Sequence, residues 1–97
     1  MKELDFHAEA SAELEAAVDF YESRLRGLGF RFLAAVGSAI ERISALLESG
    51  APLNEALRMV IVSGFPYSII YSGTDDHILL LAVAHHYRQP GYWEQRS

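Results

Sequence analysis

The sequence contains no cysteine and only one lysine, and both scarcities restrict what the chain can be. Without cysteine there is no disulfide framework, thiolate metal site or cysteine nucleophile. No stretch reaches the roughly 18 apolar residues of a membrane span. Acidic residues also interrupt the beginning of the chain, where a signal peptide would be apolar. We therefore predict a soluble, cytoplasmic protein that makes no contact with a membrane.

Positive charge is also scarce. The chain has 13 acidic and 8 basic residues and a formal net charge of -5. A protein that neutralises nucleic-acid phosphates needs clustered lysine and arginine. Tight autonomous binding to DNA or RNA is therefore not expected.

The usual catalytic motifs are missing as well. The sequence has no phosphate loop, dinucleotide fingerprint, nucleophile elbow or zinc-binding helix, which excludes most enzyme classes. His85 and His86 are adjacent and, on a strand, would point to opposite faces, so they would not bind one metal together. No cofactor and no metal site are predicted.

At 97 residues and 51% hydrophobic content, the chain fits one domain that spans residues 1–97. Alternating residues predict a strand from Lys2 to Phe6. Three- and four-residue apolar spacing predicts a helix over residues 8–26 and another over residues 30–48. The glycines at 27 and 29 separate them by so short a connection that the helices should be antiparallel neighbours.

The rest of the chain has strand character. Strands are predicted over residues 57–62, 67–72 and 77–86, with polar turns between them and Pro90 after the last. The predicted fold class is α+β: an N-terminal strand, an antiparallel helical hairpin and a three-stranded antiparallel meander, with the helices on one face of the sheet.

The last predicted strand is apolar on both faces. Strict alternation puts Ile78, Leu80, Ala82 and Ala84 on one face and Leu79, Leu81, Val83 and His85 on the other. One helical hairpin covers only one face, and the other is expected to include Val60, Val62 or Ile70. Either a partner or a second copy of the chain covers that face, or the tail from Tyr87 to Trp93 folds back over it.

Residues with chemical potential gather near the C-terminus. The group comprises His85, His86, Tyr87, Arg88, Tyr92, Trp93 and Arg96, together with Arg58 farther upstream. A histidine as general acid or base, with arginine and tyrosine assisting, would suit RNA cleavage. In the structural alternative, the histidines pack at the core and its rim, Tyr92 and Trp93 anchor the tail, and Arg58 pairs with an acidic residue of a helix.

Several segments resemble one family. They are residues 12–21, the LGFRFL segment at 28–33, Arg58 ahead of FPYSIIY at 65–71, and AVAHHYRQPGYW at 82–93. In this order they resemble the RelE/ParE superfamily of type II toxin-antitoxin toxins, specifically its ParE-like (plasmid stabilisation) branch. The resemblance implies a small α+β toxin whose cognate antitoxin wraps around the sheet and the helical hairpin.

The resemblance leaves two activities open. RelE-like members cut mRNA on the ribosome, which would assign catalysis to Arg58, His86, Arg88 and Tyr92. ParE-like members inhibit DNA gyrase, which would assign target binding to Tyr87, Arg88, Tyr92 and Trp93, and antitoxin binding to Val60, Val62 and Ile70. The acidic chain favours the gyrase inhibitor over the endonuclease, because work on ribosome-bound RNA needs a basic surface. An inactive scaffold bound to antitoxin is a third possibility, and a homodimer is also compatible with the sequence.

Overall fold

The computed structural model describes residues 3–96, which form two long helices and a five-stranded mixed sheet. The sheet order is β1-β5-β4-β3-β2, in which β1 runs parallel to β5 and the other neighbours are antiparallel. The elements in chain order are β1 (Glu3–Phe6), α1 (Ala8–Arg24), α2 (Leu28–Ala45), the 3₁₀ turn η1 (Leu47–Ser49), β2 (Ala51–Pro52), β3 (Arg58–Ile61), β4 (Tyr67–Gly73) and β5 (His77–His85).

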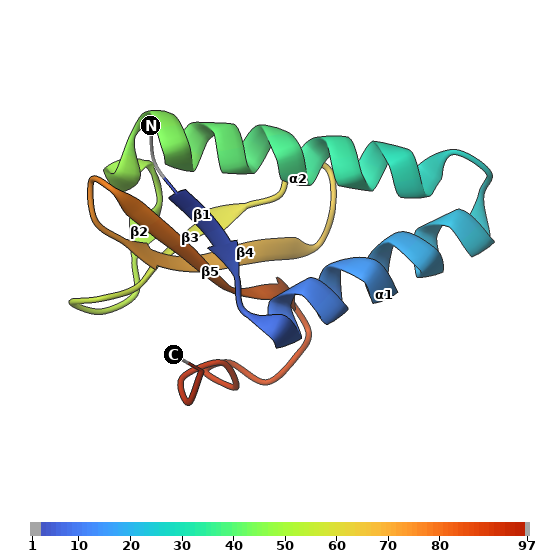
Figure 1. Cartoon of the computed structure of the whole chain (residues 1–97). Coiled ribbons are helices and arrows are strands. Elements are labelled where there is room, and N and C mark those ends of the chain that lie inside the picture. Colours follow the sequence, from blue (N-terminus) through green and yellow to red (C-terminus); the bar gives the residue numbers. More distant parts are fainter. Residues whose placement is uncertain (1–2, 97) are drawn as a thin grey trace.

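The helices form an antiparallel hairpin that packs on one face of the sheet and extends past its end (Figure 1). The predicted α+β class is thereby confirmed. Several bounds differ from the prediction. Helix α1 ends at Arg24, and α2 begins at Leu28 and ends at Ala45, where it gives way to a 3₁₀ turn. A two-residue strand, β2, also lies at the sheet edge beside β3. Lys2, the predicted start of the first strand, is outside the described residues.

Helix α2 supplies most of the helical contribution to the main core. Its apolar stripe buries Phe32, Val36, Ala39 and Ile43, a spacing that keeps one helix face toward the sheet. Helix α1 buries only the small side chains Ala10 and Ala17, which lets it lie close to its neighbours. Neither helix, within the described residues, is long and apolar enough to cross a membrane.

The hairpin turn is held by one carboxylate. Glu22, near the end of α1, accepts hydrogen bonds from the backbone N–H groups of Gly27 and Gly29 at 2.9–3.1 Å. Because the first N–H groups of a helix lack partners within that helix, this carboxylate stabilises the start of α2. Gly27 has a φ of 88°, a conformation that glycine adopts without strain.

Strand β5 contains a β-bulge that changes which residues share a face. Ile70 pairs with Ala82, but Tyr71 pairs with Leu80, so Leu81 is an extra residue. As a result, Leu80 and Val83 both belong to the helix-side core, whereas Ala82 faces the opposite side. The prediction of strict alternation along this strand was wrong, because the extra residue shifts the pattern by one position.

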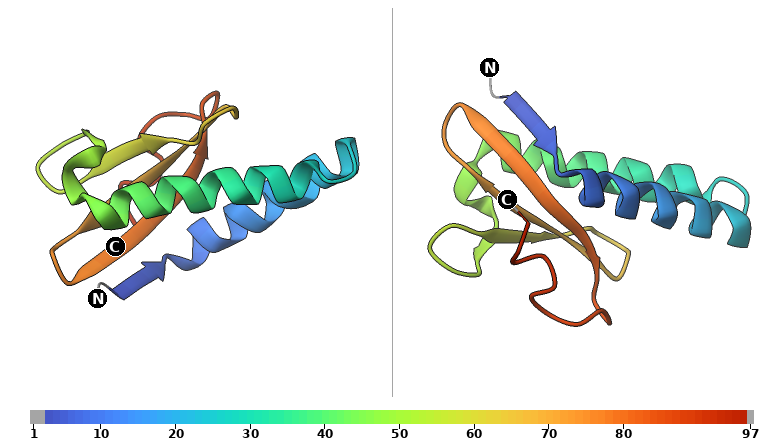
Figure 2. Two further views of the ribbon diagram at one scale, coloured as in Figure 1. Left: turned by 90° about the horizontal axis from the view of Figure 1, so that it is seen from above. Right: turned by 60° about the horizontal axis from the view of Figure 1, so that its bottom comes forward.

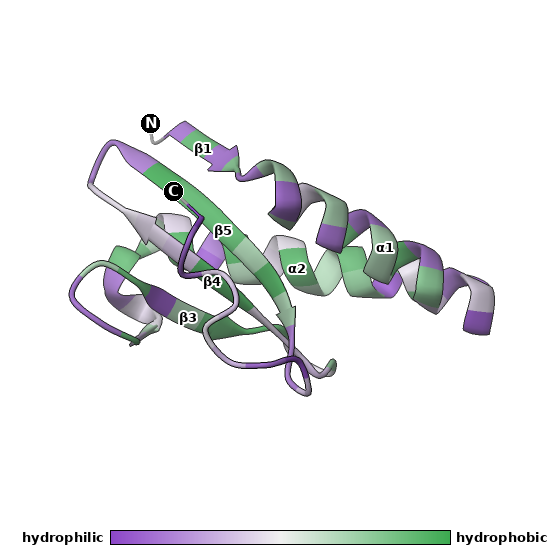
Figure 3. Cartoon of the chain, turned by 90° about the horizontal axis from the view of Figure 1, so that it is seen from below, coloured by the Kyte–Doolittle hydropathy of each residue, from purple (hydrophilic) through white to green (hydrophobic). Residues whose placement is uncertain are grey.

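The second face of the sheet is covered by the C-terminal segment. The chain turns after β5 and runs across the face opposite the helices (Figure 2). Tyr92 and Trp93 pack there against a small buried cluster of Ile70, Ala82 and Ala84. Figure 3 shows the segment lying across strands whose residues are largely hydrophobic. Of the two predicted alternatives, the structure therefore has the tail fold back over this face.

Val60 and Val62 are on the other side of the sheet. Both are buried in the helix-side core, whereas Met59 contacts the cluster beneath the tail. The expectation that Val60 and Val62 share an uncovered face with Ile70 was wrong, because alternation along β3 directs them toward the helices. Ile70 does lie on the second face, where the tail buries it.

Two glycines of α2 give opposite expectations for substitution by alanine. A Cβ at Gly29 would lie 2.8 Å from the carbonyl oxygen of Val18, whereas one at Gly37 would meet no heavy atom within 4 Å. We expect Gly29→Ala to destabilise the fold by about 1–3 kcal/mol through overpacking. Gly37→Ala should stabilise it by roughly 0.5–1 kcal/mol, because alanine favours the helix. Urea denaturation of both variants tests this, and equal stabilities would contradict the close approach of α1 to α2.

Candidate functional site

The candidate site lies along the edge of β5, beyond the point at which the neighbouring strand β1 ends. Strand β1 pairs with β5 only as far as Leu80. Beyond that point, the Val83 N–H donates to Oε1 of Glu13 on α1 at 3.0 Å. The carbonyl of Leu81 accepts a hydrogen bond from Arg96 at 2.9 Å. Side chains from the helix and the tail thus satisfy backbone groups that an exposed edge would leave open.

Glu13 connects three parts of the molecule. Its carboxylate accepts hydrogen bonds from both terminal nitrogens of Arg96, at 2.9 and 3.1 Å. It also accepts one from the Tyr92 hydroxyl at 2.7 Å and one from Arg88 at 3.0 Å. The Glu13 side chain is 13% exposed and that of Arg96 7%, so water screens this ion pair little. Helix α1, strand β5 and the tail therefore meet at a single carboxylate.

The aromatic ring of Tyr92 lies near two guanidinium groups. The central carbon of Arg88 is 3.7 Å from the ring centroid, and that of Arg96 is 5.0 Å away. Contacts of this kind are attractive because a cation interacts with the ring quadrupole. Tyr92 thus contributes its ring to the arginines and its hydroxyl to Glu13.

The protonation states of the cluster follow from its contacts. Burial raises the pKa of Glu13, but hydrogen bonds from Arg96, Tyr92 and the Val83 N–H outweigh it, so the pKa lies below its usual value. Burial, with the hydrogen bond to Glu13, raises the pKa of Tyr92. At neutral pH, Glu13 is therefore charged and the Tyr92 hydroxyl keeps its proton.

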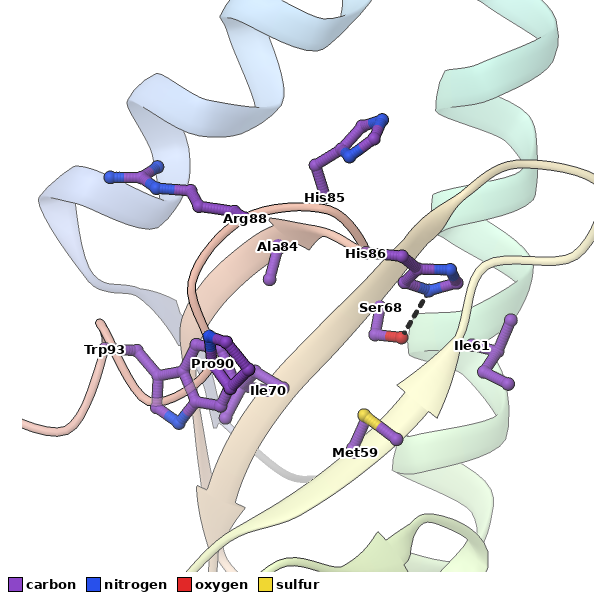
Figure 4. A pocket seen from close by; sticks show the side chains of 10 residues that line it. All are labelled: Met59, Ile61, Ser68, Ile70, Ala84, His85, His86, Arg88, Pro90 and Trp93. Carbon is purple, nitrogen blue, oxygen red and sulfur yellow. Dashed lines mark hydrogen bonds between the residues drawn. The ribbon is translucent and has the colours of Figure 1, made fainter.

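A pocket of about 280 Å³ lies between the sheet and the tail (Figure 4). Its lining is mainly apolar, and five of its residues carry a side-chain nitrogen or oxygen; the full set is Met59, Ile61, Ser68, Ile70, Ala84, His85, His86, Arg88, Pro90 and Trp93. The Oγ atom of Ser68 is 2.9 Å from Nε2 of His86. His85 packs instead against Tyr67 on the helix side, with its ring nearly perpendicular to the tyrosine ring. The ring of His86 is therefore bonded to Ser68 in the pocket, whereas the ring of His85 packs against Tyr67.

Tyr87 differs from the rest of the predicted cluster because it is 90% exposed. Its backbone N–H donates to Nδ1 of His85 at 3.0 Å, and the two rings lie 5.3 Å apart. Tyr92 and Trp93 are partly buried against the sheet. Of the four residues predicted to bind a target, the accessible ones are therefore Tyr87 and Arg88, while Tyr92 and Trp93 anchor the segment that carries them.

Arg58 lies apart from this cluster. It donates to the carbonyl oxygens of Gly50 at 2.8 Å and Glu48 at 3.4 Å, and it lines a separate hollow with Tyr71. The expected ion pair with an acidic helix side chain is absent from the described contacts of Arg58, because backbone carbonyls take its donors. The four residues of the predicted nuclease site are thus not brought into one pocket.

Metal-ligating atoms come together at one other place among residues 3–96. Glu3, Asp5 and His77 place one ligand atom each within 4.8 Å of one another, at the start of β1 and β5. Asp5 and His77 already pair with each other at 2.7 Å. Exposed acidic groups often gather without an ion, and the contact between Asp5 and His77 links β1 to β5.

Comparison with known proteins identifies the family. The sequence matches the model of the family described as "ParE toxin of type II toxin-antitoxin system, parDE" over residues 4–90. The chain belongs to the ParE toxin family. The fold of this ParE-family chain is similar to a solved structure titled "Chromosomal ParDE TA system from P. aeruginosa", with a TM-score of 0.61 and 22% identity. That similarity covers 88% of this chain and 96% of the other. No match was found among curated proteins.

The predicted resemblance to the ParE branch is confirmed, but sequence reasoning missed the residue at the centre of the site. Glu13 is one of several acidic residues along α1, and nothing in its local spacing distinguishes it. The pair of arginines near the end of this acidic chain, Arg88 and Arg96, could have indicated that a carboxylate elsewhere in the chain pairs with them. Cations that lie beside a sheet edge commonly pair with a carboxylate.

The lowered pKa of Glu13 makes the stability of this ParE-family protein depend on pH. Because the folded state holds the proton less tightly than the unfolded state, Glu13 contributes stability above its unfolded pKa of about 4.5. That contribution disappears as the pH falls through the folded value. We expect Glu13→Gln to cost roughly 1.5–3 kcal/mol at pH 7.

The difference between wild type and Glu13→Gln should then shrink steadily below pH 4.5. Denaturant unfolding of both proteins at a series of pH values measures it. A difference that stayed constant down to pH 3 would show that the charge on Glu13 does not stabilise the fold.

Proposed function

We propose that this toxin acts by binding a protein target, DNA gyrase, and that a cognate antitoxin neutralises it. The observation that carries the proposal is Tyr87, whose side chain is almost fully exposed beside Arg88 on a segment fixed to the body of the protein. Tyrosine and arginine are enriched among residues that dominate protein-protein binding energy. A segment that is already attached to the body loses less conformational freedom on binding than a free one.

The distribution of charge also supports a protein target. The net charge is -5, and among the predicted nuclease residues Arg58 is bonded to backbone carbonyls and Arg88 to Glu13. A surface that cuts RNA on the ribosome needs cations free to meet phosphates. The predicted histidine, His86, contacts Ser68 on the far side of the sheet from the hollow that holds Arg58. These contacts favour gyrase binding over endonuclease activity.

The antitoxin meets a different surface in this proposal. Val60, Val62 and Ile70 were the residues predicted for it, but all three are buried within the chain. An apolar hollow lies along the hairpin instead, formed by Leu14, Val18 and Leu33 and bordered by acidic residues of α1. An amphipathic helix with a basic edge fits such a groove. Antitoxin binding at the hairpin would leave the Tyr87 surface for gyrase.

Two assays test the activity. Induced expression without antitoxin should arrest growth, and purified protein should block the supercoiling of relaxed plasmid by gyrase. Growth arrest with normal supercoiling and with mRNA cut on ribosomes would transfer the function to the endonuclease. Normal growth despite abundant folded protein would favour an inactive scaffold.

The role of Tyr87 is tested by its replacement. Tyr87→Ala should weaken gyrase inhibition by roughly 30-fold, the loss expected when a residue worth about 2 kcal/mol is truncated. Its thermal stability should stay near that of wild type, because an exposed side chain contributes little to folding. Leu53→Ala is the matched control, since Leu53 is another exposed large apolar side chain, at 42%. Equal inhibition by both variants would remove Tyr87 from the interface.

A further inference from the structure

The C-terminal segment makes most of its polar side-chain attachments to the body through Glu13. We call residues 86–96 the strap. His86 still bonds to the body, through its N–H to the carbonyl of Pro66 at 2.9 Å. Beyond it, the backbone hydrogen bonds of the strap within the described chain are local, such as Glu94 to Gly91 and Arg96 to Trp93. Side chains therefore hold the remainder of the strap in place.

Two sets of side-chain contacts predominate, beside the hydrogen bond from Arg96 to the carbonyl of Leu81, the ion pair of Arg96 with Glu9 and the contact of His86 with Ser68. Tyr92 and Trp93 pack on the apolar cluster of the second sheet face. Arg88, Tyr92 and Arg96 all donate hydrogen bonds to Glu13. Apolar contacts are not directional, whereas hydrogen bonds to one carboxylate fix the position and angle of each donor. Glu13 is thus the acceptor that three side chains of the strap share.

Both oxygens of the Glu13 carboxylate accept more than one hydrogen bond. Oε1 accepts from the Val83 N–H and Arg96, and Oε2 accepts from Tyr92, Arg88 and Arg96. Each oxygen therefore faces at least two donors. An amide in place of the carboxylate would turn one oxygen into a donor and set N–H groups against N–H groups.

We propose that Glu13 is the positioning residue of the target-binding site: it locks the strap over the second sheet face and so fixes Arg88, and with it Tyr87, in the orientation that meets the target. The role of Glu13 in target binding rests on the proposed function, whereas its locking of the strap does not. When Glu13 is lost, the strap opens, Arg88 loses its place on the Tyr92 ring, and the sheet face beneath becomes accessible.

The lock has a built-in reporter, since Trp93 is the single tryptophan of the chain and lies on the strap. Glu13→Gln keeps the shape of the side chain but removes its charge and half of its acceptors. We expect a red shift of Trp93 emission and at least a twofold increase in quenching by acrylamide. Glu9→Gln is the matched control, because Glu9 lies on the same helix and, among residues 3–96, its carboxylate pairs with Arg96 alone, at 3.4 Å. Its fluorescence should equal that of wild type.

A second variant keeps the test decisive if Glu13→Gln fails to fold. Tyr92→Phe removes a single donor to Glu13 and leaves the ring beside both arginines. It should increase quenching in the same direction but less than Glu13→Gln. Circular dichroism at the assay temperature establishes that each variant is folded. Unchanged quenching in folded Glu13→Gln, or in Tyr92→Phe should the first not fold, overturns the lock.

Assays of growth arrest and of gyrase inhibition test whether Glu13 positions the target-binding residues. Glu13→Gln, expressed without antitoxin at the same soluble level as wild type, should slow growth arrest and weaken gyrase inhibition at least tenfold, and Glu9→Gln should do neither. An open strap with undiminished inhibition overturns the positioning role while leaving the lock intact. If wild type itself neither arrests growth nor inhibits gyrase, the proposed function falls, and the fluorescence result still decides the lock.

Discussion

The rest of the structure depends on one constraint, which is that the sheet is apolar on both faces. A short chain has enough residues for one helical hairpin, and that hairpin covers one face. The remaining face, with Ile70, Ala82 and Ala84, is buried by the C-terminal segment instead. Because this segment has no regular secondary structure of its own, it needs strong side-chain anchors, and Glu13 with Arg96 supplies them.

Glu13 and Arg96 stabilise both the edge of the sheet and the C-terminal tail. The bulge at Leu81 and the early end of β1 leave backbone groups of β5 without a strand partner. Glu13 and Arg96 bind those groups and each other, so the same two side chains cap the edge and fasten the tail. In this ParE-family fold, the exposed Tyr87 therefore projects from a segment that Glu13 attaches to helix α1.

Sequence reasoning recovered what depends on local periodicity and missed what depends on distant contacts. The two helices, the four strands β1, β3, β4 and β5, and the second apolar face all follow from residue patterns. Strand β2 escaped because two residues, one of them proline, carry no alternation. The bulge escaped because one extra apolar residue among many leaves no trace in composition. Glu13 escaped because its partners lie near the other end of the chain, and only the folded topology brings them to α1.

The parallel pairing of β1 with β5 has a consequence for how the protein is made. Leu4 is synthesised among the first residues, yet its strand partner, Ile78, comes from the last fifth of the chain. The sheet therefore cannot close, and Glu13 cannot meet its arginines, until almost the whole chain has left the ribosome. A chain that ends before β5 lacks both the parallel partner of β1 and the arginines that bind Glu13. The order of elements thus ties closure of the sheet to synthesis of the last strand.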